Sequence, residues 1–139
     1  MQVYTFRKHM TRNPEHRNLT ELLIVERDEK RLPILRKAIR TGTILAEAAS
    51  LARDMVNQPA NLLTPADMAR MAQDIARRWN LGFEVLERAH MERLGMGGLL
   101  GVSQGSDQPP KFIILKYEGD ERSKKHMALV GKGLTFDSG

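Results

Sequence analysis

The stretch MALVGKGLTFDSG, residues 127–139, decides how this chain is interpreted. Its first four residues, Met127–Val130, are apolar and predict a short buried strand. Gly131-Lys132-Gly133 follows, and Asp137 lies five residues after the lysine. In open α/β sheets ligands bind where strands end, so Lys132 and Asp137 could face one crevice. The alternative is an ordinary turn with Lys132 in solvent, because charged residues after strands are usually exposed.

Upstream of this stretch, short β-type patterns alternate with helical ones. The strongest strand pattern is KFIILKY, residues 111–117. Weaker β-type patterns cover residues 3–6, 22–25, 83–86 and 99–102. Apolar residues at helical spacing predict helices over residues 35–56, 65–79 and 87–94. This alternation predicts an α/β fold whose sheet is at least partly parallel and is covered by helices.

Local signals mark the ends of these helices. Thr64 is expected to cap the second helix, with Pro65 in its first turn and Asp67 at the positive end of its dipole. Gly95 follows the third helix at a position where glycine commonly ends helices. Gly42 is a weak point at which the first helix could break.

The composition is that of a globular protein with a basic balance. The chain has 22 Lys and Arg against 17 Asp and Glu, a net charge of +5, and no cysteine. Disulfides and thiolate catalysis are therefore excluded. No apolar run approaches the length of a membrane span, and the first residues do not resemble a signal peptide, which favours the cytoplasm. The basic residues are scattered among acids and only 5% of residues are aromatic, so nucleic-acid binding is the weaker interpretation.

Several catalytic patterns can be set aside. The P-loop pattern is not met around Lys132. The glycine-rich residues 94–106 miss the dinucleotide fingerprint, since Leu100 stands where glycine belongs and a helix precedes them. Glycines for tight turns are the better interpretation there. No histidine has a second one at ligand spacing, so all are interpreted as surface or packing residues: His9, His16, His90 and His126.

Three stretches, in this order, resemble the leucyl aminopeptidase family, the cytosol aminopeptidases with two metals. They are ARDMVNQPANLLTP (residues 52–65), residues 94–117 with their glycine-rich part and following strand, and residues 130–139. The third is the most specific, and the resemblance covers about residues 47–139. It implies a three-layer mixed sheet covered by helices, as in two-metal exopeptidases, incomplete at its C-terminal side. Residues 1–30 would be the tail of an N-terminal domain or a linker, and residues 31–139 the first part of the catalytic domain.

The resemblance also implies a metal site. Lys132 would match the lysine that ligates one metal, and Asp137 the aspartate that bridges two divalent ions, usually manganese or zinc. A lysine amine coordinates only when neutral, and burial beside two cations would favour that form. The family's catalytic lysine and arginine would lie beyond Gly139, so no catalytic residue is assigned in this chain.

The expected function is therefore that of a fragment of a metal-dependent aminopeptidase that releases leucine-like N-terminal residues from peptides. The family further implies peptide substrates and a homohexamer. Because two protein ligands cannot define a two-metal site, the isolated chain is predicted to be inactive. The alternative is a non-catalytic basic module that binds nucleic acid or a protein partner.

Overall fold

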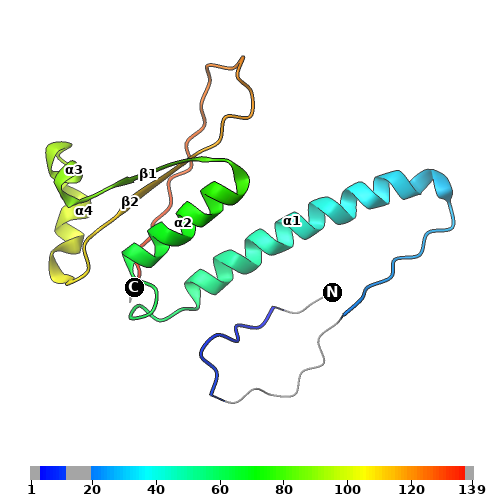
Figure 1. Ribbon diagram of the computed structural model, residues 1–139, viewed down its shortest axis with the longest axis horizontal. Helices are drawn as coiled ribbons and strands as arrows, with labels where there is room; N and C mark the ends of the chain where they lie inside the picture. The colour runs from blue at the N-terminus through cyan, green and yellow to red at the C-terminus, as the bar shows by residue number, and fades with distance from the viewer. Residues whose placement is uncertain (1–3, 12–19, 137–139) are drawn as a thin grey trace. The chain divides into compact units, whose positions relative to one another are not determined.

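The computed structural model describes residues 4–11 and 20–136, and the chain divides into two compact units, residues 1–58 and 59–139 (Figure 1). The first unit is built around one long helix. The second combines a helix with a two-stranded sheet and two short helices. The helices and strands are, in chain order, η1 Glu29–Arg31, α1 Leu32–Val56, α2 Pro65–Trp79, β1 Gly82–Leu86, α3 Arg88–Arg93, α4 Gly97–Val102, η2 Ser103–Gly105 and β2 Phe112–Lys116.

Helix α1 confirms the helix predicted over residues 35–56 and begins slightly earlier. It follows directly from η1, where the Asp28 side chain accepts a hydrogen bond from the Lys30 amide at 3.0 Å. The helix passes Gly42 without a break, since one glycine costs a helix only about 1 kcal/mol. No residue of α1 is buried.

The start of the chain is tied to the end of α1 by polar contacts. The Tyr4 hydroxyl donates to Asp54 Oδ1 at 2.7 Å and accepts from Asn57 Nδ2 at 3.2 Å. The Arg53 guanidinium lies 5.4 Å from the centre of the Tyr4 ring. These contacts hold residue 4 in place without any strand.

The strands predicted at residues 3–6 and 22–25 are wrong for the residues that the structure describes; Val3 lies outside them. Residues 4–6 and 22–25 have no strand assignment, and the side chains of Leu23 and Val25 are 79% exposed. A β-type sequence becomes a strand only when another strand supplies its hydrogen-bond partners. The described part of this unit has no such neighbour.

Helix α2 confirms the second predicted helix, with Thr64 as its N-cap and proline in its first turn. Ala72 and Ala76 on α2 are buried, and with Leu63 and Met91 they form the core of the second unit. The helix ends at Asn80, which takes the left-handed conformation (φ 51°, ψ 49°). Asparagine tolerates this conformation better than most residues.

Strands β1 and β2 confirm the patterns at residues 83–86 and 111–117, but they pair antiparallel. The register places Gly82 opposite Lys116 and Leu86 opposite Phe112. The expected parallel pairing is not found within residues 20–136. The reason is the connection: α3 and α4 lie together at one end of the sheet (Figure 1), so the chain enters β2 at the end where it left β1.

The connection between the strands agrees with one prediction and corrects another. Helix α3 confirms the short helix over residues 87–94, and Gly95 after it has the positive φ of 66° expected of a helix-ending glycine. Residues 99–102, predicted as β-type, belong instead to α4. Their apolar run is too short for periodicity to separate a strand from a buried helix.

The strand predicted at Met127–Val130 is also wrong in this structure. These residues have no strand assignment, and Met127, Leu129 and Val130 are 89–92% exposed. Among the described residues, no strand lies in register with them. The apolar run therefore has the composition of a buried strand but lacks the neighbour that would bury it.

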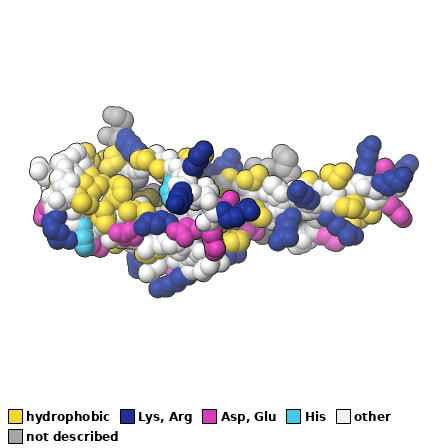
Figure 2. All heavy atoms as spheres, turned by 90° about the horizontal axis from the view of Figure 1, so that it is seen from above, with side chains coloured by type: hydrophobic (Ala, Val, Ile, Leu, Met, Phe, Trp, Pro, Cys, Tyr) yellow, Lys and Arg dark blue, Asp and Glu magenta, His cyan; other side chains and the backbone are white. Residues whose placement is uncertain are grey.

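Charged side chains are spread rather than gathered. On the face shown in Figure 2, Lys and Arg side chains are interspersed with Asp and Glu. Several opposite charges are paired within hydrogen-bond or ion-pair distance, among them Lys111 with Glu87, Lys116 with Glu84 and Arg122 with Asp120. No helix of the described residues is long and apolar enough to cross a membrane.

Candidate functional site

The segment predicted to begin a metal site runs along the start of α2. A Cβ atom built on Gly133 would lie 3.7 Å from the Met68 Cε atom, which is ordinary van der Waals contact. Lys132 precedes this contact and is exposed. The lysine is therefore placed on the α2 side of the second unit, at the end of the apolar run.

Asp137 lies outside the described residues, so the structure does not bring Lys132 and Asp137 together or separate them. The assignment of both as metal ligands stays a prediction. Among residues 4–11 and 20–136, no group of three or more His, Asp or Glu side chains could hold a metal ion. One lysine amine is too small a donor set for a two-metal site, so the described residues alone do not fit the metal pair.

Three of the four histidines lie where the sequence predicted, at the surface. His9, His90 and His126 are exposed, and His16 falls outside the described residues. The glycine-rich residues around Gly97 form the short helix α4 rather than a nucleotide loop. Gly97, Gly98 and Gly101 have no neighbouring atoms within 4 Å of a built Cβ. These three glycines belong to the short helix α4.

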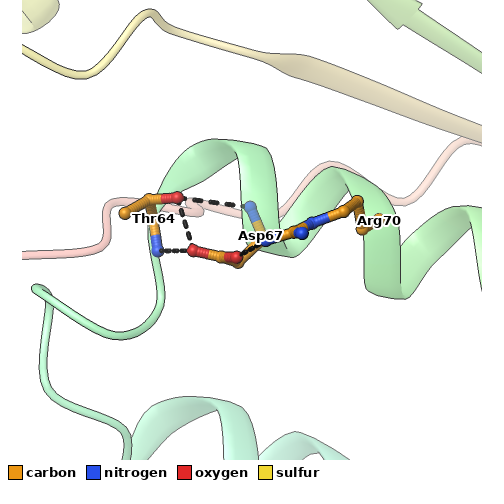
Figure 3. A network of polar contacts seen from close by, with 3 residues as sticks. All are labelled: Thr64, Asp67 and Arg70. Carbon is orange, nitrogen blue, oxygen red and sulfur yellow. Dashed lines mark hydrogen bonds and ion pairs between the residues drawn. The ribbon is translucent and has the colours of Figure 1, made fainter.

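A polar network fixes the start of α2 beside the segment that carries Lys132 (Figure 3). The Thr64 amide donates to Asp67 Oδ2 at 2.9 Å, and the Asp67 amide donates to Thr64 Oγ1 at 3.3 Å. This reciprocal capping box satisfies two amides that a helix start leaves unpaired. The Thr64 hydroxyl also donates to Asp67 Oδ2, and Arg70 forms an ion pair with Asp67 Oδ1.

These contacts change the acidity of the carboxyl group. The pKa of Asp67 is lowered from its ordinary value, first by the hydrogen bonds from the Thr64 side chain and backbone and then by Arg70. Partial burial opposes this shift without cancelling it. The sequence predicted Thr64 as the cap and Asp67 at the positive end of the helix dipole, but neither the reciprocal hydrogen bond of Asp67 nor its ion pair with Arg70. The signal that could have indicated Arg70 is its position three residues after Asp67, since this spacing brings side chains together on a helix surface.

A second feature escaped sequence analysis altogether. A cavity of about 540 Å³ lies beside α2 and β1, with Arg70, Glu87 and Lys111 among its lining residues. Lys111 Nζ donates to both oxygens of Glu87, at 2.6 and 2.5 Å. Twenty-four positions separate the two residues in sequence. Only the antiparallel pairing of β1 and β2 brings them together, so no local pattern could have found them.

Comparison with known proteins shows to which family this chain belongs. The profile of the cytosol aminopeptidase family, catalytic domain, matches residues 50–139. This chain belongs to the cytosol aminopeptidase family. The match confirms the resemblance found over residues 47–139 and includes both predicted ligands, Lys132 and Asp137.

Curated relatives extend the similarity along nearly the whole chain. A probable cytosol aminopeptidase of Alkaliphilus metalliredigens is 47% identical over 99% of this chain, which corresponds to 28% of that relative. A probable cytosol aminopeptidase of Bacillus subtilis is 38% identical over 95% of this chain, which corresponds to 26% of that relative. One from Solibacter usitatus is 51% identical over 77% of this chain, which corresponds to 22% of that relative. The aligned part of this chain thus spans between 22% and 28% of the length of these relatives.

Solved structures show a similar arrangement. The bottromycin maturation enzyme BotP is 41% identical to this chain and superposes with a TM-score of 0.57. The superposition includes 60% of this chain and 18% of BotP. The same enzyme in complex with Mn gives a TM-score of 0.58 at the same identity and coverage. Over 60% of this chain, the α/β arrangement of the described residues therefore resembles part of that longer chain.

Proposed function

We propose that this chain forms the part of a metal-dependent aminopeptidase that leads into its metal site. The complete protein would release leucine-like N-terminal residues from peptides. The observation that carries this proposal is the family match over residues 50–139 together with 47% identity to a probable cytosol aminopeptidase along 99% of the chain. In this scheme residues 1–30 are the tail of an N-terminal domain or a linker, and residues 31–139 are the first part of the catalytic domain.

Lys132 and Asp137 would contribute two of the ligands of a metal pair, either manganese or zinc. Lys132 would help to hold the metal ions through a neutral amine, and Asp137 would do so through its carboxylate. When bound, such a pair polarises a carbonyl group and activates water. The further ligands, the catalytic lysine and the arginine would come from the three quarters of the relatives' length that this chain does not represent.

The same proposal extends to architecture and assembly. In the complete protein, a three-layer mixed sheet would continue from β1 and β2, and Met127–Val130 would become one of its strands. That change would bury the side chains of Leu129 and Val130, which are 92% exposed in the isolated chain. A homohexamer in the cytoplasm that acts on peptides is the assembly and setting that this family membership supports best.

The alternative, a basic binding module, has weaker support. A face that binds nucleic acid gathers cations, whereas the cations seen in Figure 2 lie among acids. Lys111 and Lys116 are moreover paired with Glu87 and Glu84. If the alternative were correct, the chain would bind DNA or RNA at low salt, and its affinity would fall steeply as salt rises.

A chimera tests the proposed function. Residues 1–139 of this chain would replace the matching 28% of the Alkaliphilus metalliredigens relative, and hydrolysis of leucine 4-nitroanilide would be measured with added manganese. We expect activity in the chimera and none in the isolated chain. Lys132→Ala and Asp137→Ala should each lower the activity of the chimera by more than about 100-fold, because loss of an outer-shell partner alone costs 10–100-fold.

A matched control separates ligand loss from charge loss. Lys124 is an exposed lysine in the loop between β2 and the apolar run, and Lys124→Ala should leave the chimera active. A folded chimera without activity would contradict the proposed function. Full activity in the Lys132→Ala or Asp137→Ala chimera would contradict the proposed ligands while leaving the aminopeptidase assignment in place.

A further inference from the structure

The cavity beside α2 and β1 has an apolar wall made by two elements of the second unit. Ala66 and Ala69 line it from α2, and Phe83 and Val85 line it from β1. The two alanines lie three residues apart on one helix face, and the two strand residues share one face of the sheet. The small helix side chains leave space against the larger strand side chains. The resulting volume, about 540 Å³, lies within the range of small-molecule sites.

An ion pair lines the cavity next to this wall. Lys111 Nζ donates to Glu87 Oε1 and Oε2 at 2.6 and 2.5 Å, and the lysine side chain is only 16% exposed. An ammonium group has three N–H donors, so these two bonds leave one for another acceptor. Each carboxylate oxygen has a further lone pair, so Glu87 can accept another donor. The pair can therefore bind one positive and one negative group of a ligand at once.

A second cation and an amide complete the polar lining. Arg70 lies on the same α2 surface as Ala66 and Ala69, and its guanidinium has five N–H donors. Its ion pair with Asp67 uses only part of that capacity. Gln73 supplies both donor and acceptor atoms. The cavity thus combines two cations, one anion and an apolar wall.

We propose that this cavity binds a free α-amino acid with an apolar side chain, such as leucine. The ammonium group of the ligand binds Glu87, and its carboxylate binds the third N–H of Lys111 and the guanidinium of Arg70. The side chain lies on Phe83 and Val85. Charge complementarity selects this occupant, since a simple acid would add a negative charge beside Glu87 with no ammonium group to offset it, and a simple amine would offer no acceptor to the third N–H of Lys111 or to the remaining N–H groups of Arg70.

The choice of leucine as probe rests on the proposed function, whose product would be leucine; the binding itself does not require peptidase activity. The test therefore uses the 139-residue chain alone. A chain that binds no leucine leaves the chimera experiment untouched, and an inactive chimera leaves the binding measurement untouched. The two proposals can fail independently.

The experiment is a titration of the ¹⁵N-labelled chain with L-leucine, followed by amide chemical shifts. We expect saturable shifts at Ala69, Val85 and Glu87 with a roughly millimolar Kd, because the site is open to water and the ligand is small. N-acetyl-leucine, which lacks the ammonium group, and leucinamide, which lacks the carboxylate, should each bind at least about tenfold more weakly. Glycine, which lacks the side chain, should do the same.

Substitutions locate the site. Glu87→Gln and Lys111→Met should weaken leucine binding at least about tenfold. Lys116→Met is the matched control, since Lys116 pairs with Glu84 across the same two strands at 3.3 Å but does not line the cavity. Ala69→Leu fills the cavity without touching the ion pair and should abolish the shifts in a chain whose other amide resonances are unchanged.

Three results would overturn the proposal. The first is the absence of saturable shifts with leucine at the three amides of the cavity. The second is equal binding of leucine, N-acetyl-leucine and leucinamide. The third is equal binding of leucine by the Lys111→Met and Lys116→Met chains, because the ion pair would then play no part.

Discussion

Helices α1 and α2 form the centres of the two units, and they are stabilised in different ways. The longer one, α1, has 25 residues, no side-chain hydrogen bond at its N-cap and no buried residue. The shorter one, α2, has 15 residues, a complete capping box and two buried alanines. Length alone therefore does not measure how firmly a helix is held. Most helical stability in proteins comes from packing, and here the packing is concentrated in the second unit.

The largest expected effect of a substitution is at the core of the second unit. Met91 is 0% exposed, and Met91→Ala should destabilise this unit by about 3 kcal/mol through lost burial and the cavity left behind. Hydrogen exchange of amides in α2, β1 and β2 should accelerate accordingly, while exchange in α1 should not change. Equal acceleration in both units would show that they unfold together and would remove the contrast between them.

The next effect tests the capping of α2. Thr64→Ala removes the hydroxyl that accepts from the Asp67 amide and should cost about 1 kcal/mol, measured by urea unfolding. Thr43 in α1 is the matched control, since its hydroxyl only donates to the Ile39 carbonyl at 2.9 Å within the helix. Thr43→Ala should be neutral or slightly stabilising, because alanine is the better helix former. A similar cost at both positions would contradict the special role of Thr64.

The first unit offers the opposite change. Gly42 lies inside α1, and a Cβ atom built there meets nothing within 4 Å. Gly42→Ala should therefore stabilise α1 by roughly 0.5–1 kcal/mol. The gain should be visible as slower amide exchange near residue 42 and as higher helix content by circular dichroism. A loss of helix content would mean that the face around Gly42 is covered by something the described residues do not include.

The smallest effect is a pH dependence at the α2 cap. The pKa of Asp67 is lowered in the folded chain, so its contribution to stability is fully present above the pKa of the unfolded chain, about 3.9. It is lost as the pH falls through the lower folded value. Asp67→Asn should therefore flatten the decline of unfolding free energy below about pH 4. If the unfolding free energy of Asp67→Asn declined as steeply as that of the unchanged chain, the decline would be due to other carboxylates.

The features that local chemistry decides could be predicted from the sequence. The start of α2 at Thr64 and the left-handed Gly95 depend on neighbours within a few residues. Features that depend on a partner strand could be predicted only in part: the two β patterns that became β1 and β2 were recognised, but each is a strand because the other supplies its hydrogen-bond partners. Residues 22–25 and 127–130 have β-type sequences and no strand beside them in the described chain, and the pairing of β1 with β2 depends on where α3 and α4 turn.

The candidate sites divide along the same line. Lys132 and Asp137 were predicted as metal ligands because such a motif is compact in sequence, and both their role and their geometry remain predictions, since Asp137 lies outside the described residues. The pair formed by Glu87 and Lys111 was missed because strand register alone brings the two side chains together. A sequence motif shows which residue types lie close together in the chain, whereas the register of β1 and β2 is known only once the structure is known.

The exposed run Met127–Val130 has a consequence for the lifetime of the chain in a cell. Three of its four side chains are 89–92% exposed, and an apolar segment in water is what chaperones and proteases act on. Burial of this run would hide it from both. The abundance of the chain in a cell would then indicate whether residues 127–130 are buried, without any measurement of peptide cleavage.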